Sequence, residues 1–412
     1  MISLINMKNF EPLYLSAREA AAELAISPAT LYAYVSRGLV RSEPVGDTRA
    51  RRYRADDVRA LKNRRAPPGD VRSHKPFDAD MPVMDSAVAT ITEEGPLYRG
   101  VNAVSLSQTA TLEQAATLLW DVSGSDPFSP TNMPVLSEAM RAVMSATRNE
   151  APMARTVAVL ALASDADPRA YNLSQEGRTQ VGARIMRLIA ACILNTAPSA
   201  DPIHRQMART WAPDHKHAED LFRRALVLLA DHELNASTFT LRCAASTGLN
   251  LYDAVIAGLV ALKGPKHGGA GPMAAQMLER LAEGDIAALV RERVSQGELI
   301  PGFGHTVYKS GDPRAQELLS ALQRAGADKR LAVEAPRLIT EATGLFPNID
   351  FTLALLMRML GLSIGHEMSL FAVARTAGWI AHGIEQLKTR GLIRPRARYV
   401  GPPPGRASAS NR

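Results

Sequence analysis

Residues 231–270 read DHELNASTFTLRCAASTGLNLYDAVIAGLVALKGPKHGGA, a stretch in which apolar helical segments alternate with polar or glycine-rich corners. The first corner places His232 and Asn235 in the middle of an apolar helical pattern, where a buried polar side chain needs a partner. The last corner brackets His267 with glycines, and the later stretch PGFGHTVYKSGDPRA does the same for His305. A single buried histidine is commonly a satisfied core residue. Two that are bracketed by glycines indicate backbone brought close to a ligand.

The rest of the chain favours helices. Its 412 residues have room for two or three domains of about 100–200 residues each, and a hydrophobic content of 46% is too high for a disordered protein. Aromatic residues, which strands favour, make up only 5%. Short alternating stretches around Glu94-Gly95-Pro96 predict one small hairpin, and apolar residues recur at helical spacing from Thr111 onward. We therefore predict an all-α body.

Positive charge is concentrated at the front of the chain. The formal net charge is +7, and residues 1–75 hold 14 Lys and Arg against 8 acidic residues. The remainder is close to neutral. A polyanionic partner would therefore contact the basic front segment, and the nearly neutral remainder of the chain would have a separate function.

Several classes of protein are excluded by patterns that the sequence lacks. No apolar run approaches the about 18 residues that span a bilayer, and the start shows no signal-peptide pattern. Cys192 and Cys243 lie in apolar helical stretches, so we expect two buried thiols in a reducing cytoplasm. No nucleotide-binding glycine loop and no metal-ligand spacing is present. We expect a cytoplasmic protein without membrane contact, bound metal or permanently bound cofactor.

The front of the chain shows the order helix, tight turn, helix, hairpin and helix. Ser16 and Glu19 have capping-box spacing, and Gly46-Asp47 offers the hairpin turn. This order resembles the winged helix-turn-helix of MerR-type regulators and excisionases. The residues expected to meet DNA are Thr30, Tyr32, Arg49, Arg51 and Arg52. The alternative is a small helical domain whose basic face is solvated and serves dimer contacts.

Blocks spread over residues 80–400 resemble the citrate synthase family in order and spacing. They are ITEEGPLYRG, TLEQAATLLW, DHELNASTF, GPKHGGA, PGFGHTVYKSGDPRA, NIDF, MLGL, LFAVARTAGWIAH and LIRPRARYVG. The resemblance implies the all-α, two-domain fold of that family, preceded here by a small winged helix-turn-helix domain. The expected parts are a winged helix-turn-helix at 1–65, a linker at 66–79, a large helical domain at 80–266 and 367–400, a small helical domain at 267–366, and a disordered tail at 401–412.

The resemblance also implies the catalytic residues. His267 matches the histidine that donates a hydrogen bond to the thioester carbonyl of acetyl-CoA, and Asp350 matches the carboxylate that removes a methyl proton. His305 matches the histidine that polarises the keto group of oxaloacetate. A helix beginning near Pro272 would favour a neutral His267, which can donate without first losing a proton. For Asp350, the alternative is a cap of the helix FTLALLMRML.

The binding residues follow from the same resemblance. His232, Arg314 and Arg375 match residues that hold the oxaloacetate carboxylates, and the planar forks of arginines suit such a dianion. Arg394 matches an arginine that reaches in from the partner subunit, so the site implies a homodimer. Considered alone, Arg375 and Arg394 fit surface ion pairs.

For coenzyme A, the expected contacts are the open backbone of Gly302-Phe303-Gly304 and the base Lys309. The resulting leading function is condensation of acetyl-CoA with oxaloacetate to citrate and free coenzyme A. One alternative is 2-methylcitrate synthesis from propionyl-CoA, since an extra methylene changes pocket fit by only about 1–3 kcal/mol. The other is a DNA-binding regulator that uses the synthase body as a metabolite sensor, which has no chemical need for His267, His305 and Asp350 together.

Overall fold

The computed structural model describes residues 14–24, 26–36, 39–45, 51–55, 57–58, 61, 84–389, 391–397, 399 and 401. They divide into two compact units, Met1–Met84 and Asp85–Arg412, and each is described by itself. The predicted linker at 66–79 lies outside the described residues, as do Gly46, Asp47, Arg49 and the predicted tail beyond Gly401.

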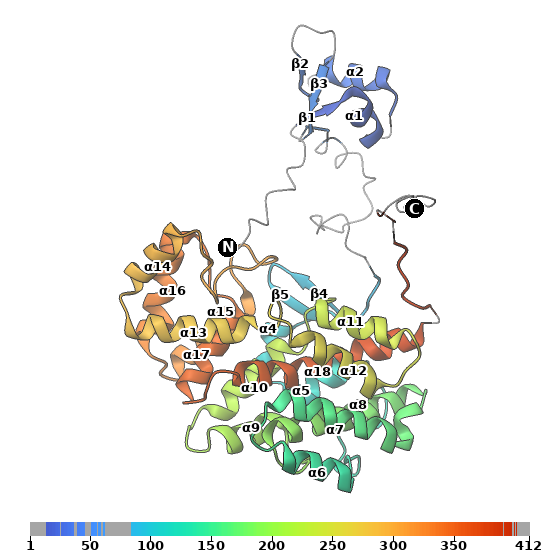
Figure 1. Ribbon diagram of the computed structural model, residues 1–412, viewed down its shortest axis with the longest axis vertical. Helices are drawn as coiled ribbons and strands as arrows, with labels where there is room; N and C mark the ends of the chain where they lie inside the picture. Colours follow the sequence, from blue (N-terminus) through green and yellow to red (C-terminus); the bar gives the residue numbers. More distant parts are fainter. Residues whose placement is uncertain are drawn as a thin grey trace, which may run out of the picture. The chain divides into compact units, whose positions relative to one another are not determined.

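The front unit combines helices with a three-stranded antiparallel sheet (Figure 1). Its elements are β1 (Tyr14–Ser16), α1 (Ala17–Glu23), α2 (Pro28–Ser36), β2 (Ser42–Pro44) and β3 (Arg51–Arg54). β3 pairs with β1 on one side and with β2 on the other. The predicted helix-turn-helix with short strands is confirmed.

Local sequence signals explain the helices of the front unit. Ser16 and Glu19 form the expected capping box, in which the backbone N–H of Glu19 donates to Ser16 Oγ and that of Ser16 donates to the Glu19 carboxylate. On α2, Leu31 is fully buried and joins Tyr53 in the core of the unit. Tyr32 is 54% exposed, and its contact with DNA stays a prediction.

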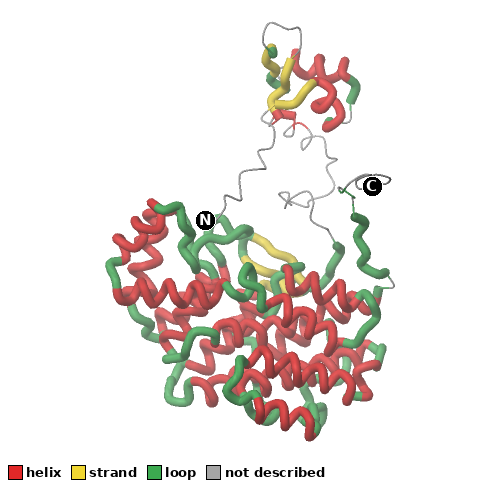
Figure 2. The backbone as a smooth tube through the Cα atoms, in the orientation of Figure 1, coloured by secondary structure: helices red, strands yellow, loops and turns green. Residues whose placement is uncertain are grey.

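The main unit is mostly helical and carries one small sheet (Figure 2). The strands β4 (Ala89–Thr92), β5 (Gly95–Tyr98) and β6 (Val101–Asn102) are antiparallel and adjacent in that order. The predicted hairpin is β4–β5, and β6 extends it. The helical elements are α4 (Ala103–Ser107), α5 (Leu112–Leu119), α6 (Glu138–Ala146), α7 (Pro152–Ala166), a 3-10 turn (Pro168–Tyr171), α8 (Gln175–Leu194), α9 (Ile203–Trp211), α10 (Ala218–Leu229), α11 (Ala236–Ala245), α12 (Leu251–Leu262), α13 (Ala270–Glu283), α14 (Ile286–Ser295), α15 (Pro313–Arg324), a π-helical turn (Arg330–Glu334), α16 (Ala335–Thr343), α17 (Ile349–Met359) and α18 (His366–Lys388).

α18 is the central helix of the main unit. It packs against α5, α8, α10, α11 and α12, and Figure 1 shows it running among the green and yellow helices. Buried residues occur on every side of it, which is stable only for a helix that is surrounded by protein. Its buried Arg375 and His382 therefore need partners, because charged and polar side chains are seldom fully buried without them.

α13 to α17 form a second group of helices, drawn in orange tones in Figure 1. α13 and α15 both pack against α17, and α14 packs against α16. These helices lie within the predicted small domain at 267–366. The structure does not divide the main unit into two compact parts, so the two domain boundaries stay a prediction.

The prediction that His232 and Asn235 lie within a helix is wrong. α10 ends at Leu229, and His232 lies on the loop that leads to α11. The Asp231 carboxylate accepts the backbone N–H of Glu233 at 2.9 Å, and the Asn235 side chain caps α11. Both side chains bond to nearby backbone in a way that favours a turn over a continuous helix.

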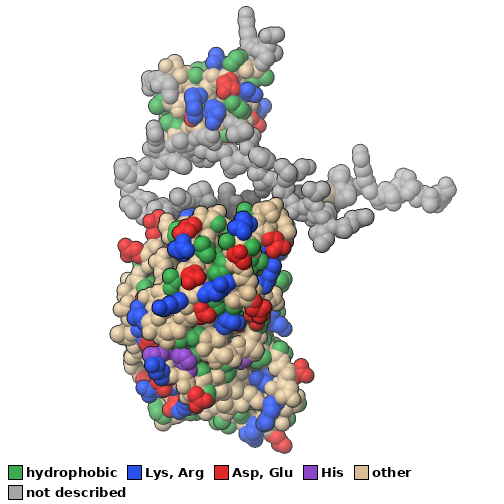
Figure 3. Space-filling model, turned by 90° about the vertical axis from the view of Figure 1, so that its left-hand side faces the viewer, with side chains coloured by type: hydrophobic (Ala, Val, Ile, Leu, Met, Phe, Trp, Pro, Cys, Tyr) green, Lys and Arg blue, Asp and Glu red, His purple; other side chains and the backbone are tan. Residues whose placement is uncertain are grey.

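Surface charge and thiols complete the description of the main unit. Basic and acidic side chains are interspersed on the face shown in Figure 3, in keeping with a nearly neutral body. Cys192 is buried as expected, whereas Cys243 is only half-buried, so the prediction of two buried thiols is wrong for Cys243. Among the described residues, no helix is both long enough and apolar enough to cross a membrane.

Candidate active site

One cavity of the main unit, with a volume of about 170 Å³, collects six of the predicted site residues. They are His232, His267, His305, Arg314, Asp350 and Arg375. The cavity is completed by Asn235, Gly268, Gly271, Ile349, Leu353, Glu367, Met368 and Phe371. The lining comes from both helix groups of the main unit, namely the α10–α11 corner and α18 on one side and α13, α15 and α17 on the other.

His232 projects from the α10–α11 loop towards two other rings. Its Nε2 lies 3.2 Å from the hydroxyl of Tyr308, and its ring centroid lies 5.7 Å from that of His305. Burial, together with the positive charges of Arg314 and Arg375, lowers the pKa of His232 well below its ordinary value. At neutral pH His232 is therefore an uncharged hydrogen-bonding group.

His267 lies just before α13, which begins at Ala270. Its Nε2 is 2.8 Å from Ser237 Oγ, which also lies 2.9 Å from Asn235 Oδ1 and accepts from Trp379 Nε1 at 3.3 Å. Burial and the charge of Arg375 lower the pKa of His267 to about 4. The expected neutral imidazole is thus supported by burial and by a neighbouring cation, and Ser237 orients its ring.

His305 has one ring nitrogen committed to the backbone. Its Nδ1 accepts the N–H of Val307 at 3.0 Å and that of Tyr308 at 3.2 Å. Burial and the charge of Arg314 lower the pKa of His305 to about 4, so the ring is neutral. Because Nδ1 is an acceptor, the single ring proton resides on Nε2, which makes Nε2 a hydrogen-bond donor.

Asp350 is the second residue of α17 and does not cap it. The cap is Asn348, whose side chain accepts the backbone N–H of Asp350 at 3.0 Å. Burial raises the pKa of Asp350 to about 6; the positive charge of Arg314 opposes this effect, and the carboxylates of Asp312 and Glu367 add to it. A carboxyl in this range is a stronger base than an exposed aspartate and is still ionised at neutral pH.

Arg314 is held in place by the cap of its own helix. Asp312 Oδ1 accepts from Arg314 Nε at 3.0 Å, and Asp312 Oδ2 accepts from Nη2 at 2.8 Å. Although burial alone would raise the pKa of Asp312, the Arg314 charge lowers it, and Asp312 in turn raises the pKa of Arg314. The guanidinium is thus permanently charged at the edge of the cavity.

Arg375 enters the cavity from α18 with one unsatisfied nitrogen. Its Nε donates to the carbonyl of Leu229 at 2.9 Å, and its guanidinium lies 4.6 Å from the ring centroid of Phe371. Its buried Nη1 has no hydrogen-bond partner among the described residues. Burial lowers the pKa of Arg375 to about 10, which still leaves it charged at neutral pH. A buried donor without a partner indicates a place for a ligand acceptor.

The arrangement suits a small dianion that reacts with a weakly acidic C–H group. Two fixed guanidiniums supply the charge for two carboxylates, and neutral His232 adds a hydrogen bond. Neutral His267 and His305 supply donors without carrying extra charge, and Asp350 supplies a base. The described residues contain no group of His, Cys, Asp and Glu that could hold a metal ion.

Arg394 and Lys309 lie outside this cavity. Arg394 is exposed in the segment that follows α18, and its assignment to a shared site stays a prediction. Lys309 is exposed, and its Nζ donates to the carbonyl of His305 at 3.3 Å. Its predicted contact with coenzyme A likewise stays a prediction.

The backbone of the loop Gly302-Phe303-Gly304 is partly bonded within the chain, and its predicted contact with coenzyme A stays a prediction. The N–H of Gly304 donates to the carbonyl of Phe346 at 2.8 Å, and the carbonyl of Gly302 accepts from the N–H of Asn348 at 2.9 Å. Both glycines have positive φ values, 87° and 80°, which this close pairing requires. These two bonds hold the loop against the residues that lead into α17, beside the cavity.

Four polar residues that sequence reasoning did not single out support the site. Ser237 contacts His267, Tyr308 contacts His232, Asp312 binds Arg314, and Glu367 lines the cavity. Ser237 follows Asn235 by two residues, and Asp312 precedes Arg314 by two, so both stand inside the quoted motifs. The position of Glu367 has no such signal, because it depends on how α18 meets α13.

The DNA-binding candidates of the front unit are described in part. Arg52 forms an ion pair with Glu43 at 3.0 Å and lies over the Tyr14 ring, 4.1 Å from its centroid. Arg51 Nε donates to Ser42 Oγ at 2.9 Å. The Thr30 hydroxyl lies 2.9 Å from that of Ser27. These side chains already take part in contacts inside the unit, and phosphate contact by them stays a prediction.

Comparisons with known proteins give a consistent result. The chain matches the family model described as Citrate synthase, C-terminal domain over residues 78–396, and the one described as MerR HTH family regulatory protein over residues 15–66. It is 30% identical over 346 residues to Citrate synthase 2 of Bacillus subtilis (strain 168), covering 77% of this chain and 93% of that protein. It is 40% identical over 192 residues to the Citrate/2-methylcitrate synthase of the same organism, covering 45% of this chain and 52% of that protein. Its fold resembles the solved citrate synthase of Thermotoga maritima MSB8 with a TM-score of 0.66 and 27% identity, over 78% of this chain and 94% of that one.

Proposed function

Since the chain belongs to the citrate synthase family and carries an N-terminal MerR-type helix-turn-helix domain, we propose that it condenses acetyl-CoA with oxaloacetate to give citrate and free coenzyme A. It is an acyltransferase of the citrate synthase type. The single observation that carries the more specific proposal is the cavity in which two buried arginines, three neutral histidines and Asp350 converge.

Oxaloacetate binding is assigned to the two guanidiniums and His232. Arg314 is fixed by Asp312, and Arg375 keeps its buried Nη1 unpaired, so each presents a charged donor before substrate arrives. Such fixed donors lose little entropy when they bind a carboxylate. Binding of oxaloacetate would satisfy the Arg375 nitrogen that the chain itself leaves without a partner.

Asp350 is assigned the removal of a methyl proton from the thioester. The methyl group is a weak acid, so a carboxylate alone is a poor base for it. Burial raises the pKa of Asp350 to about 6 and thereby strengthens it as a base. The electron pair of the broken C–H bond moves towards the thioester oxygen.

His267 is assigned the stabilisation of that oxygen. Its ring is neutral, and its Nε2 lies 2.8 Å from Ser237 Oγ, whose hydroxyl donates to Asn235 Oδ1 at 2.9 Å. Rotation of this hydroxyl towards His267 would place the ring proton on Nδ1, the nitrogen that remains for the thioester oxygen. A fixed donor at a developing oxyanion contributes about 10²–10³-fold to the rate.

His305 is assigned the polarisation of the keto group. Its Nδ1 is occupied by two backbone N–H groups, so Nε2–H is the donor that faces substrate. The carbon that Asp350 deprotonates attacks the keto carbon, and the keto oxygen takes the proton or hydrogen bond from Nε2. Hydrolysis of the resulting thioester by water releases citrate and coenzyme A. Closure of the predicted small domain at 267–366 would keep water out until the bond has formed.

A thiol-release assay with the full-length chain tests this function. Oxaloacetate is combined with acetyl-CoA in one arm and with propionyl-CoA in the other. Faster release with acetyl-CoA supports the proposal, and a preference for propionyl-CoA supports 2-methylcitrate synthesis, which the similarity to a citrate/2-methylcitrate synthase keeps as the alternative. His267→Ala and Asp350→Ala serve as matched inactive controls. No thiol release with any 2-oxo acid would overturn the enzymatic proposal.

DNA binding by the front unit is a second proposed function. The MerR-type match over residues 15–66 and the excess of basic residues at the front favour it. In this proposal the synthase body also acts as a metabolite sensor, so that oxaloacetate and coenzyme A thioesters influence binding. An electrophoretic shift assay on selected and random duplexes, with and without both ligands, tests it. Failure to bind any duplex at low salt would leave the unit as a docking or oligomerisation element.

A further inference from the structure

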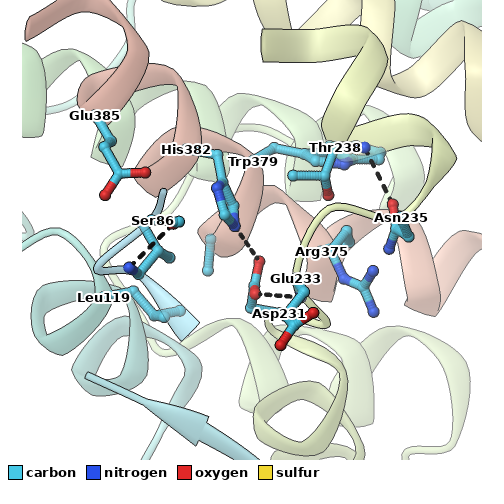
Figure 4. A network of polar contacts seen from close by, with 12 residues as sticks. Ser86, Leu119, Asp231, Glu233, Asn235, Thr238, Arg375, Trp379, His382 and Glu385 are labelled. Carbon is cyan, nitrogen blue, oxygen red and sulfur yellow. Dashed lines mark hydrogen bonds and ion pairs between the residues drawn. The ribbon is translucent and has the colours of Figure 1, made fainter. Parts of the chain in front are cut away.

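A group of buried polar side chains that does not line the cavity is not used in the chemistry above. His382 on α18 and Asp231 at the start of the α10–α11 loop are both fully buried, and His382 Nε2 lies 3.3 Å from Asp231 Oδ2. The two atoms are in polar contact, and within the described part of the chain neither of them has a hydrogen-bond partner. Figure 4 shows the His382 ring pointing from its helix to the Asp231 carboxylate.

The other side of the His382 ring fixes its tautomer. Arg242 Nη1 lies 3.2 Å from His382 Nδ1 and also donates to the Glu385 carboxylate at 2.5 Å. Since arginine only donates, Nδ1 must be the acceptor. The nitrogen that carries the ring proton is therefore Nε2, on the side of Asp231.

Asp231 in turn determines the shape of the loop that carries His232. Its Oδ1 accepts the N–H of Glu233, a residue with φ of 53°. The Glu233 carboxylate is itself anchored, because it accepts the backbone N–H of Ile91 on β4 at 2.7 Å. A positive φ at a non-glycine residue costs free energy and persists only where surrounding contacts impose it.

Close approach of α18 to the loop is built into the sequence. The N–H of Gly378 donates to the carbonyl of Ala230 at 3.0 Å, and a Cβ on Gly378 would overlap the Asp231 carboxylate. Arg375, one turn earlier on the same helix, bonds to Leu229. α18 thus contacts the residues before the loop and the first residue of the loop itself.

We propose that His382 is a positioning residue for oxaloacetate binding, acting through the 3.3 Å contact of its Nε2 with Asp231 Oδ2 to hold the loop that presents His232. The inference rests on the proposed function for the identity of the ligand. It assigns no chemical step to His382, which does not line the cavity.

The test compares His382→Gln, His382→Asn and His382→Leu in the full-length protein. A glutamine amide nitrogen can occupy the place of Nε2 and still donate to Asp231, whereas the shorter asparagine falls short of it. We expect Leu and Asn to raise the KM for oxaloacetate about tenfold, with the KM for the acyl-CoA changed less than about twofold, and Gln to restore most of the loss. Equal oxaloacetate KM values for the Gln and Asn variants would overturn the proposal, even if the Leu variant fails to fold.

A matched control separates positioning from general stability. Ile380 is buried on the same helix and lies close to Gly182 of α8. Ile380→Ala should lower the melting temperature without raising the KM for oxaloacetate. A rise in KM as large as that of His382→Leu would show that any loosening of α18 is sufficient, and would overturn a specific role for His382.

Hydrogen exchange gives a readout that does not depend on turnover. The backbone N–H of Glu233 should exchange faster in His382→Leu and His382→Asn than in the wild type or His382→Gln. Unchanged exchange would overturn the positioning role, whatever the substrate. Absence of turnover in the wild type together with faster exchange in the variants would instead remove only the proposed function.

Discussion

Asp312 binds Arg314 with both carboxylate oxygens, at 3.0 Å to Nε and 2.8 Å to Nη2, although the two residues are only two positions apart. Asp312 is also the cap of α15 and accepts the backbone N–H of Ile349 at the start of α17. The pair is buried, so the carboxylate compensates the charge of Arg314 where water cannot. One aspartate therefore orients a cation that lines the cavity and joins two helices beside it.

Removal of this carboxylate should cost both stability and binding. Asp312→Ala leaves Arg314 buried without its partner, and breaking a buried pair costs about 3–5 kcal/mol. We expect a lower denaturation midpoint and a higher KM for oxaloacetate. Glu341→Ala, which removes the exposed ion pair with Arg337, is the control and should change the free energy of unfolding by about 1 kcal/mol or less. Similar effects of the two variants would contradict the assigned role of Asp312.

Asp350→Asn should abolish turnover and stabilise the protein at neutral pH. The pKa of Asp350 is raised from 3.8 to about 6 in the folded state. Protonated Asp350 therefore stabilises the fold fully below pH 3.8, and this stabilisation is lost as the pH rises through about 6. Above pH 6 the buried charge costs about 3 kcal/mol, which the neutral amide avoids. Melting temperatures of the variant and the wild type, measured at pH 7.5 and below pH 4, test this expectation. The higher melting temperature of the variant should disappear below about pH 4, the ordinary pKa of aspartate, because Asp350 of the wild type is then protonated as well. A variant that keeps most of its kcat would show that the base is misassigned.

The acid limb of the pH profile should depend on Glu367. Protonated Asp350 cannot accept a proton, so kcat/KM should fall as the pH drops below about 6. The Glu367 carboxylate raises the pKa of Asp350, and Glu367→Gln removes that charge with little change of shape. We therefore expect its acid limb to move to lower pH, while Glu341→Gln leaves the limb in place. An acid limb that moves to higher pH in Glu367→Gln would contradict the assigned effect of Glu367 on the pKa of Asp350.

Arg394→Ala tests whether the site is shared between subunits. If Arg394 serves the partner's cavity, the variant should show a raised KM for oxaloacetate, and Arg396→Ala in the same exposed segment should not. At an oxaloacetate concentration far below the raised KM, Arg394→Ala should show little activity, and mixing it with inactive Asp350→Ala should restore activity, because one of the two sites in each heterodimer is then intact. With random exchange, about a quarter of the wild-type activity is expected. No recovery after confirmed subunit exchange would argue against a shared site.

Arg51→Ala combined with Arg52→Ala should weaken DNA binding to all sequences alike. Phosphate contacts carry no base information, and each one lost should reduce the salt slope by about 0.9. Since Glu43 pairs with Arg52, Glu43→Gln should have the opposite effect and strengthen binding. Binding titrations over a range of salt concentrations measure both, with turnover as the control that should stay unchanged. Loss of affinity for one selected duplex only would instead indicate base contacts.

Much of the architecture follows from patterns within a few residues. The capping box of Ser16 and Glu19, the β4–β5 hairpin and the helical body are confirmed, because caps, turns and helical periodicity act over one or two turns of chain. The same local reasoning fails at residues 231–235. There the pattern reads as helix, but side chain-to-backbone bonds and contacts from α18 impose a loop.

The candidate site divides in the same way. The sequence by itself determined which residue types are present at His267, His305, Asp350 and the arginines, and the order of their motifs. Only the tertiary structure decided that six of them share one cavity, that Ser237 and Asp312 orient two of them, and that His382 meets Asp231 across the chain. It also decided their protonation, because the lowered pKa values of the histidines and the raised pKa of Asp350 arise chiefly from burial, and burial depends on segments that are far apart in sequence.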